Sequence, residues 1–280
     1  SKLSFEASWL RLLQAQSGEE KPVVIDPTVP EKPLKVSDLV RFLENPGRSF
    51  AHQSLGLYLH DYDLGLEDDE PFNSSKLVEY KLRQQMFVAA LSHEPEACQL
   101  VREEYQLNGQ LPESHLAASI IDTTQQQAQE LVDELQALGY EEVQKHWVSM
   151  SISGVIIEDY LPLMGDATDV TSPLKAILSR PTKAKTKDRL TLWLTSLLAE
   201  VAFQQPVVGV SVHLEKNLQL HELHDAAGQL DKILALYTLG LTQALPLDAE
   251  LGQELLKVDP QDIDKRRVKW QKKWYHHKYS

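Results

Sequence analysis

The chain has 280 residues, which is enough for one large domain or two small ones, and its 42% apolar and 25% charged residues are typical of an ordinary globular protein. No apolar run reaches the roughly 18 residues of a membrane span, and the single cysteine, Cys98, excludes an internal disulfide framework and favours the cytoplasm. The net charge of −13 argues against a free-standing nucleic-acid binder, whose surface is usually basic.

The first part of the chain is predicted to form an arm and then a mostly helical subdomain. Residues 1–35 contain four prolines and little apolar sequence to bury, which is typical of a linker or an arm on another surface. Because the chain starts at Ser1 without Met, we expect a piece of a longer protein. The helical subdomain covers 36–124. Its predicted elements are a helix capped by Ser37 that ends before Pro46, a strand at Leu55–Leu59, and helices at about 75–92 and 95–107.

Residues 125–256 are predicted to form an α/β core, followed by a basic tail at 257–280. The order of the core elements is helix, three-stranded meander, buried helix, strand and helix. They are a helix at Gln125–Leu138 capped by Gly139, a strand at Trp147–Ile152, a turn at Ser153-Gly154, a strand at Val155–Leu161 that Pro162 ends, a strand at Leu174–Leu178, a helix at Leu190–Phe203, a strand at Val207–Leu214, a helix at Glu222–Gln243, and a short helix at 248–257.

This order resembles the PD-(D/E)XK, or restriction-endonuclease-like, fold of Mg²⁺-dependent nucleases. The resemblance implies an Asp after the second strand and a D/E-x-K motif on the third, whose carboxylates hold Mg²⁺ while the lysine helps to activate the attacking water. Ile157 stands where the Asp is expected, and Pro173 stands where the carboxylate should precede Lys175. Neither side chain can bind a cation. The sequence therefore predicts an inactive nuclease-like core, with no metal or other cofactor.

A more specific resemblance rests on several segments in fixed order and spacing over about residues 36–256. They are Leu39–Phe50 (LVRFLENPGRSF), Asp69–Phe72 (DEPF), Ser153–Ile157 (SGVII), Tyr160–Pro162, Leu192–Leu194, Val207–Leu214 and Ala244–Pro246. Together they resemble the C-terminal domain of the RecC subunits of exodeoxyribonuclease V, the bacterial helicase–nuclease that processes double-strand DNA ends. The resemblance implies a nuclease-like domain without a working active site, RecB-type and RecD-type subunits as partners, and a role in subunit assembly and DNA-end handling during repair and recombination.

Basic residues gather in two segments of this acidic chain. Residues 175–189 hold six Lys and Arg against one Asp, and residues 261–280 hold seven against two. In the first segment we predict sequence-independent, salt-sensitive contacts with DNA phosphates, made by Lys175, Arg180, Lys183, Lys185, Lys187 and Arg189. In the tail, Trp270, Trp274 and Tyr275 are predicted to cover an apolar patch of a partner subunit, with stacking on unpaired bases as the alternative. Solvated surface charge is the simplest interpretation of either segment alone.

Two other functions remain open at this level. One is an active Mg²⁺-dependent nuclease with a displaced site around Asp159 and Asp169, although carboxylates in loops are usually only solvated. The other is a protein–protein adaptor that never touches DNA. A zinc site at His221 and His224 is disfavoured, because these two histidines at i, i+3 spacing lack a third ligand at a diagnostic distance along the chain.

Overall fold

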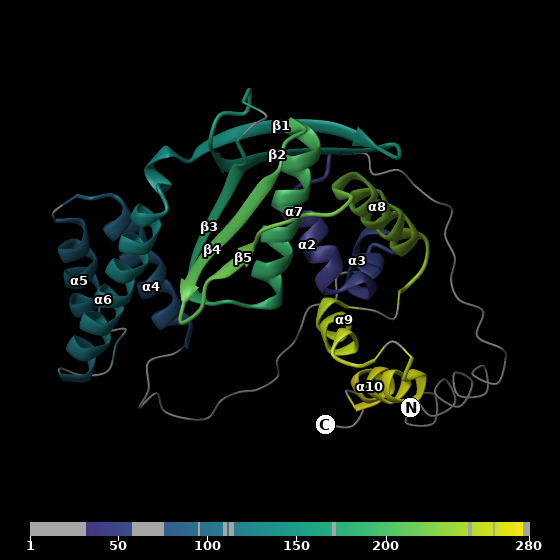
Figure 1. Ribbon diagram of the computed structural model, residues 1–280. Helices are drawn as coiled ribbons and strands as arrows, with labels where there is room; N and C mark the ends of the chain where they lie inside the picture. The colour runs from purple at the N-terminus through teal and green to yellow at the C-terminus, as the bar shows by residue number, and fades with distance from the viewer. Residues whose placement is uncertain are drawn as a thin grey trace, which may run out of the picture.

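The centre of the molecule is a five-stranded mixed sheet with the strand order β1-β2-β3-β4-β5 (Figure 1). The computed structural model describes residues 32–57, 76–94, 96–108, 111, 115–169, 172–245, 248–259 and 261–276. The strands are β1 Gln144–Ile152, β2 Val155–Met164, β3 Leu174–Lys183, β4 Val207–Leu214 and β5 Leu218–Leu220. The predicted α/β class is confirmed. Within the described ranges, no helix combines the length and the apolar character that crossing a bilayer would need.

The connections follow the predicted order of elements. Helix α6 (His115–Ala137) leads into β1, and β1, β2 and β3 form an antiparallel meander. Helix α7 (Thr186–Phe203) then carries the chain to β4, which pairs with β3 in parallel, and β5 returns antiparallel to β4. The parallel pair needs such a helical crossover, because a short turn cannot reverse the chain twice.

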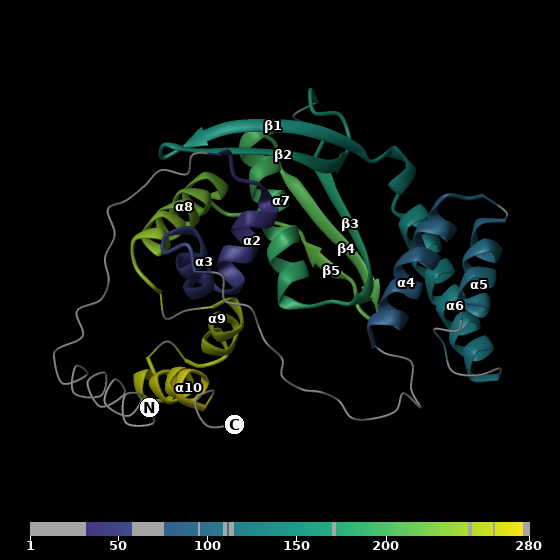
Figure 2. The same ribbon diagram turned by 180° about the vertical axis from the view of Figure 1, so that it is seen from behind.

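Helices cover both faces of the sheet, and each face has its own apolar cluster. One cluster joins α7 to α2 (Val36–Glu44) and α8 (Ala226–Thr242), and the other joins α4 (Lys76–Leu91) to α6. Side chains of alternating parity on β3 and β4 enter the two clusters, as the pleat requires. Helix α3 (Pro46–Gln53) lies with α2 and α8, and α5 (Ala97–Leu107) lies with α4 and α6 (Figures 1 and 2).

The region predicted as a helical subdomain, 36–124, is thus shared between two faces. Its first helices, α2 and α3, pack with α7 and α8, whereas α4 and α5 pack with α6 on the other face of the sheet. Helix α6 itself runs across the predicted boundary at 124.

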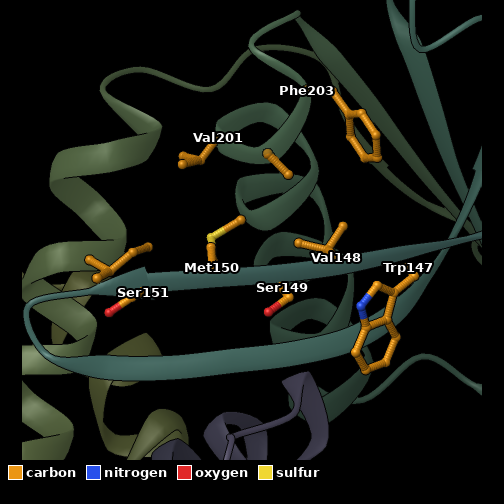
Figure 3. A pocket seen from close by; sticks show the side chains of 9 residues that line it. Trp147, Val148, Ser149, Met150, Ser151, Val201 and Phe203 are labelled. Atoms are coloured by element: carbon orange, nitrogen blue, oxygen red, sulfur yellow. The ribbon is translucent and has the colours of Figure 1, made fainter.

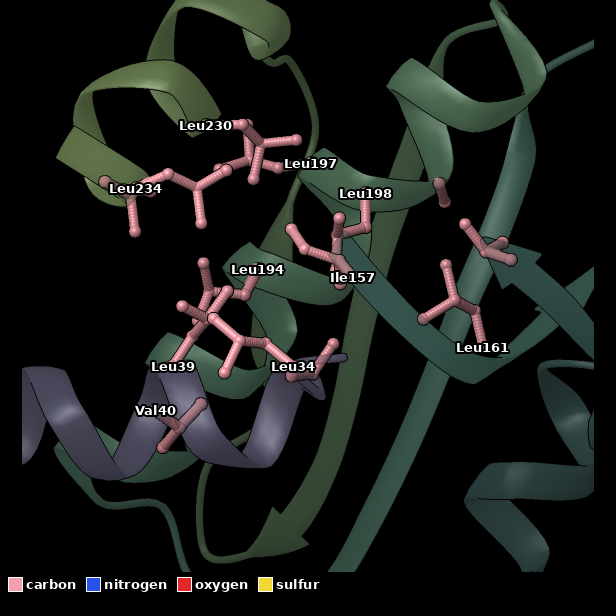
Figure 4. Close-up of a cluster of buried hydrophobic side chains, with 14 of the residues drawn as sticks. Leu34, Leu39, Val40, Ile157, Leu161, Leu194, Leu197, Leu198, Leu230 and Leu234 are labelled. Carbon is pink, nitrogen blue, oxygen red and sulfur yellow. The ribbon is translucent and has the colours of Figure 1, made fainter. Parts of the chain in front are cut away.

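A short N-terminal segment fixes α2 to the sheet. Leu34 forms a parallel bridge with Ile157: its N–H donates to the Ile156 carbonyl and its carbonyl accepts from the Glu158 N–H, both at 2.8 Å. The Val36 N–H then donates to Asp159 Oδ2 at 3.0 Å, so a carboxylate of β2 satisfies one donor in the first turn of α2. Leu34, Leu39, Val40 and Ile157 consequently meet α7 in one buried cluster (Figure 4).

The prediction that Pro162 ends the second strand is wrong, since β2 continues to Met164. The two-residue turn at Ser153-Gly154 has positive φ at both residues, and it makes Ile152 and Val155 a hydrogen-bonded pair. Counting along the ladder from that pair, Pro162 opposes Lys145 at a non-hydrogen-bonded position. A proline there removes no bond between β1 and β2.

Other differences from the sequence prediction have local causes. Leu55–Leu57 are not a strand, because Gly56 has φ +64°, a left-handed conformation outside the β region. Helix α6 begins ten residues earlier than expected: Ile121 is fully buried there, so packing outweighs the modest helix propensity of its Ile, Ser and Thr residues.

The caps of two helices also differ from prediction. The N-cap of α2 is Lys35, whose N–H donates to Asp38, and Ser37 lies within the first turn. Helix α8 begins at Ala226 after the N-cap Asp225. The short helix α9 (Ala249–Leu256) agrees with the prediction, whereas β5 and helix α10 (Ile263–His276) were not predicted. The predicted arm up to residue 31 and the segment Asp69–Phe72 lie outside the described residues.

Candidate nucleic-acid interface

Most of the basic residues predicted to contact DNA gather where β3 ends and α7 begins. The exposed ones are Lys183, Lys185, Lys187 and Arg189, which we call the basic turn. Arg180 precedes them on β3 and is half-buried. Lys175 is exposed at the opposite end of β3, eight residues and about 26 Å from Lys183. The structure does not bring Lys175 to the basic turn.

A bulge in β3 positions the basic turn. The register between β3 and β4 shifts between Arg180 and Lys183, which face His213 and Leu214 on β4. Pro181 lies inside this irregularity and has no N–H to give to a ladder, so an interruption of the pairing at this point is expected from the sequence. A bulge bends its strand, and here it turns the chain out of the sheet into the first turn of α7.

Two of the basic side chains are held by carboxylates. Arg180 Nη1 donates to Asp188 Oδ1 at 3.1 Å, and the Tyr80 side chain on α4 also hydrogen-bonds the guanidinium. Lys183 Nζ lies 2.6 Å from Glu215 Oε1, but both side chains are mostly exposed, so this pair is weak. Arg180 is therefore a structural residue, whereas Lys183 can exchange its partner for a phosphate at little cost.

The rest of the basic turn faces solvent. Among the residues that the structure describes, the ion pairs found do not involve Lys185, Lys187 or Arg189. These cations stand at the N-terminus of α7, whose unpaired N–H groups add positive partial charge. The lysine ammonium groups are point charges on flexible side chains, which can bind a phosphate backbone without distinguishing one base from another. The chemistry that this turn offers is thus sequence-independent anion binding.

A buried polar group supports the turn from β4. His213 is almost fully buried, and its Nε2 lies 2.8 Å from Ser211 Oγ. Burial lowers the pKa of His213, and the neighbouring Asp188 carboxylate opposes this effect in part. The backbone N–H of His213 donates to Asn217 Oδ1 at 3.0 Å, and Asn217 in turn donates to Glu134 on α6. The backbone of β4 under the bulge is therefore tied through Asn217 to the loop before β5 and to α6.

The residues expected to mark an emptied cation site are not brought together. Ile157 is fully buried in the cluster with α2 and α7, next to Leu34. Pro173 is exposed just before β3. Strands β2 and β3 pair only where Leu163 and Met164 meet Ala176 and Lys175, so Ile157 is six residues, or about 20 Å, from that contact. This register corrects the expectation that Ile157 and Pro173 stand at the positions of two ligands of one cation.

Asp159, one carboxylate of the displaced-site alternative, and Asp166, which precedes the other candidate Asp169 by three residues, have structural partners. Both oxygens of Asp159 accept backbone N–H bonds, from Val36 at 3.0 Å and from Tyr160 at 2.8 Å. Asp166 caps a turn by accepting from Thr168, which lowers its pKa. Within the described ranges, no group of three His, Cys, Asp or Glu side chains could hold a metal ion, and this includes His221 and His224.

We expect Asp159→Ala to lower the free energy of unfolding by about 1–2 kcal/mol, because the Val36 N–H at the start of α2 loses its acceptor. We also expect the purified wild-type domain to leave linear DNA intact in Mg²⁺ or Mn²⁺. Urea unfolding and a gel-based cleavage assay measure the two effects. Cleavage by the wild type that disappears in Asp159→Ala, with stability unchanged, would instead identify Asp159 as a metal ligand.

The aromatic residues of the tail lie on α10, which was predicted only as a basic tail. Trp270, Trp274 and Tyr275 all fall within this helix. Helix α10 packs on α9: Lys269 Nζ lies 3.0 Å from Glu254 Oε2. Sequence reasoning also missed the pairing of Arg180 with Asp188, although the i, i+8 separation of opposite charges across a strand-to-helix turn could have suggested it.

Comparisons with known proteins agree with the resemblance seen in the sequence. The model of the RecC C-terminal domain family matches residues 31–259. The RecBCD enzyme subunit RecC of Escherichia coli K12 is 26% identical over 198 residues, which are 70% of this chain and 17% of that protein. The chain therefore spans about a sixth of the length of that relative.

The comparison with a crystal structure of SSO0001 covers 93% of this chain and 97% of the SSO0001 chain, at 10% identity and a TM-score of 0.35. These values do not establish a common fold. The family match is decisive by its extent, because residues 31–259 include the segment that ties α2 to β2, all the strands of the described sheet, and the basic turn. The chain thus belongs to the RecC C-terminal domain family.

Proposed function

We propose that this domain is a non-catalytic module of an exodeoxyribonuclease V-type complex in the bacterial cytoplasm. It binds RecB-type and RecD-type subunits and contacts the phosphates of double-stranded or forked DNA ends during double-strand break repair and recombination. The observation that carries the DNA contact is the basic turn, an exposed group of four cations on a chain with a net charge of −13. Family membership supports the place in the complex.

We include in this proposal a PD-(D/E)XK-like core. Its support is the order of α6, the β1–β3 meander, α7 and a β4 that pairs in parallel with β3. Both lysines of β3, Lys175 and Lys183, follow a proline at the position two residues earlier, where the motif needs a carboxylate to hold the cation.

Loss of catalysis is supported by what occupies these positions now. Ile157 fills the core beneath α2, and Lys183 pairs with Glu215 at 2.6 Å. The carboxylate of Asp159, two residues beyond Ile157, anchors Val36. The residues around the former cation site have thus taken over packing and helix attachment.

Contact with partner subunits is supported by the C-terminal helices. Leu256, Ile263 and Val268 of the α9–α10 pair are exposed by 81%, 72% and 51%. Exposed apolar groups close to Lys and Arg are typical of protein–protein interfaces. Trp270, Trp274 and Tyr275 lie on the same helix, α10. We therefore assign the pair α9–α10 to subunit contact.

The DNA contact is tested with forked DNA and the double variant Lys185→Glu, Lys187→Glu. We expect the variant to weaken binding by at least about tenfold at low salt and to reduce the slope of log affinity against log salt by about two, one for each lost phosphate contact. Fluorescence anisotropy at several salt concentrations measures both quantities.

Lys175→Glu is the matched control, since Lys175 is exposed on the same strand but at its opposite end. Its affinity should remain close to that of the wild type. Equal losses in Lys175→Glu and in either single variant of the basic turn would point to an effect of net charge alone. Wild-type binding without salt dependence would contradict phosphate contact.

A further inference from the structure

Strand β1 presents a free edge. In the described part of the chain, β1 pairs with β2 on one side and with no strand on the other. Because Ile152 and Val155 are a hydrogen-bonded pair, the N–H and C=O groups of alternate residues point away from β2. These residues are Lys145, Trp147, Ser149 and Ser151. The opposite edge of β2 shows the same alternation, since Ile156 and Glu158 use their outward backbone groups to bond Leu34.

Apart from Lys145 at its beginning, the edge lacks the features by which proteins protect free strands. It is nine residues long, and the alternate residues from Trp147 to Ser151 carry no charge. Proteins that keep an edge free usually place charges, prolines or a bulge along it. An unprotected row of backbone donors and acceptors is a template for another strand.

A groove runs beside this edge. A cavity of about 350 Å³ lies between β1 and the end of α7, and the α7 residues that line it are Val201, Ala202 and Phe203 (Figure 3). Val148 and Met150 of β1 lie on the same side (Figure 3). A strand added to β1 would therefore direct every second side chain into this groove, toward the apolar side chains of α7.

The other face of β1 also offers apolar surface. The rings of Trp147 and Tyr160 form a cross-strand pair with centroids 4.8 Å apart, and the two side chains are 52% and 59% exposed. The remaining side chains of an added strand would lie beside this pair. Large aromatic residues with half of their surface exposed are typical of interface anchors.

Negative charge at the end of α7, next to the groove, favours a cationic occupant. The last turn of α7 contains Glu200 and no basic residue, and the C-terminal end of a helix carries negative partial charge. Glu158 adds a further carboxylate on the outer face of the hairpin, where it accepts from Ser149 Oγ. Lys145 is the basic residue on the strand with outward backbone groups.

We propose that the free edge of β1 binds an extended segment of a partner subunit as an additional strand. The segment carries apolar side chains at alternate positions and a Lys or Arg that reaches the C-terminal end of α7. Backbone hydrogen bonds to β1 supply most of the binding, and the groove and the Trp147–Tyr160 pair select the side chains. This inference rests on the proposed function, because it takes the partner from the same complex.

Ser151→Pro tests the inference at one atom. Proline removes the outward N–H of Ser151, which makes no bond to β2, and an edge strand tolerates it there. Ser151→Ala is the matched control, since it keeps that N–H. Full-length subunits carrying either change are mixed with the purified RecB-type and RecD-type subunits of the same organism. Affinities are measured by calorimetry, and thermal unfolding verifies that both variants are folded.

We expect Ser151→Pro to weaken binding to one partner subunit by about tenfold, and Ser151→Ala to bind like the wild type. Glu200→Lys should weaken the same binding, whereas Glu103→Lys on the remote α5 should not. Hydrogen exchange should show new protection at Trp147 and Ser149 in the complex. Equal affinities of Ser151→Pro and Ser151→Ala, without such protection, would overturn the inference.

Other outcomes separate this inference from the proposed function. If the wild type binds neither subunit, the proposed function fails, and the occupant assigned to β1 fails with it. If the partners bind but Ser151→Pro has no effect, only the use of β1 is wrong. If the wild type dimerises and Ser151→Pro makes it monomeric, the occupant is a second copy of the chain rather than a partner subunit.

Discussion

Replacing Phe42 by Ala is expected to lower the free energy of unfolding by about 3–5 kcal/mol, the range found for removing a fully buried phenylalanine. Phe42 is fully buried on α2 and meets Tyr237 of α8 edge-on, with ring centroids 5.0 Å apart. Tyr237 is itself held by a 2.9 Å hydrogen bond from its hydroxyl to Gln53. The Phe42 ring thus connects α2 to α8, whose Tyr237 in turn bonds α3, and loss of the Phe42 ring leaves a cavity that rigid helices cannot close.

Urea unfolding followed by circular dichroism measures this effect. Leu57→Ala is a suitable control, because Leu57 is 52% exposed and its truncation should change the free energy by less than about 0.5 kcal/mol. A loss of under about 1 kcal/mol in Phe42→Ala would show that α2 and α8 adjust around the missing ring, contrary to the close packing described here.

Gly240 allows the same contact to be tested from the opposite side. A Cβ at this position would lie 2.4 Å and 2.6 Å from Cε2 and Cζ of Phe42. Gly240→Ala should therefore destabilise the protein despite the better helix propensity of alanine. In the Phe42→Ala background the same change should cost less, because the ring that it meets is gone.

The strands and helices of the core could be predicted because their patterns are local. Alternation in Trp147–Ile152 and the all-round apolar character of Leu190–Phe203 indicate a half-buried strand and a buried helix, and both are present. Ser153-Gly154 likewise gives a two-residue hairpin, as its sequence suggests. Together these elements were enough to predict the α/β class and the order of the core elements along the chain.

Long-range pairing could not be predicted in the same way. The position of Ile157 relative to β3 depends on how far the two strands stay side by side. Strand β2 meets β3 only at Leu163 and Met164, whereas its earlier part pairs with Leu34 instead. Likewise, the sequence shows Asp159 only as a possible ligand, because its partner Val36 is 123 residues away. Motif spacing along one strand carries no information about such partners.

The candidate interface also combines features that could be predicted from the sequence with features that could not. Sequence counting found the cations of residues 175–189, but it could not separate Arg180, which is bound by Asp188, from Lys185, which faces solvent. It also grouped Lys175 with the others, although an extended strand places it about 26 Å away. The free edge of β1 left no signal, because whether a strand has one neighbour or two depends on the complete sheet.

Asp188 holds the basic turn together through two different bonds. Its Oδ1 accepts from Arg180 and its Oδ2 accepts the Lys185 N–H at 2.8 Å, so one carboxylate caps α7 and pairs with β3. The side chain is 9% exposed, whereas that of Arg180 is 31% exposed. Removing one partner of a buried pair costs about 3–5 kcal/mol. Water can reach the guanidinium, however, and reduces that cost.

Asp188→Ala is therefore expected to lower the free energy of unfolding by about 2–3 kcal/mol, which combines a lost cap with a partly solvated, unpaired arginine. Asp188→Asn should cost less, because its amide oxygen can still accept from the Lys185 N–H. Glu215→Ala is the matched control: it also removes one carboxylate beside the basic turn, but from an exposed pair worth under about 1 kcal/mol.

Both alanine variants add one unit of positive charge, so DNA binding driven by charge alone should increase equally in the two. If Asp188→Ala instead binds DNA less well than Glu215→Ala while remaining folded, the position of the cations, fixed by Asp188, controls phosphate contact as well as their number.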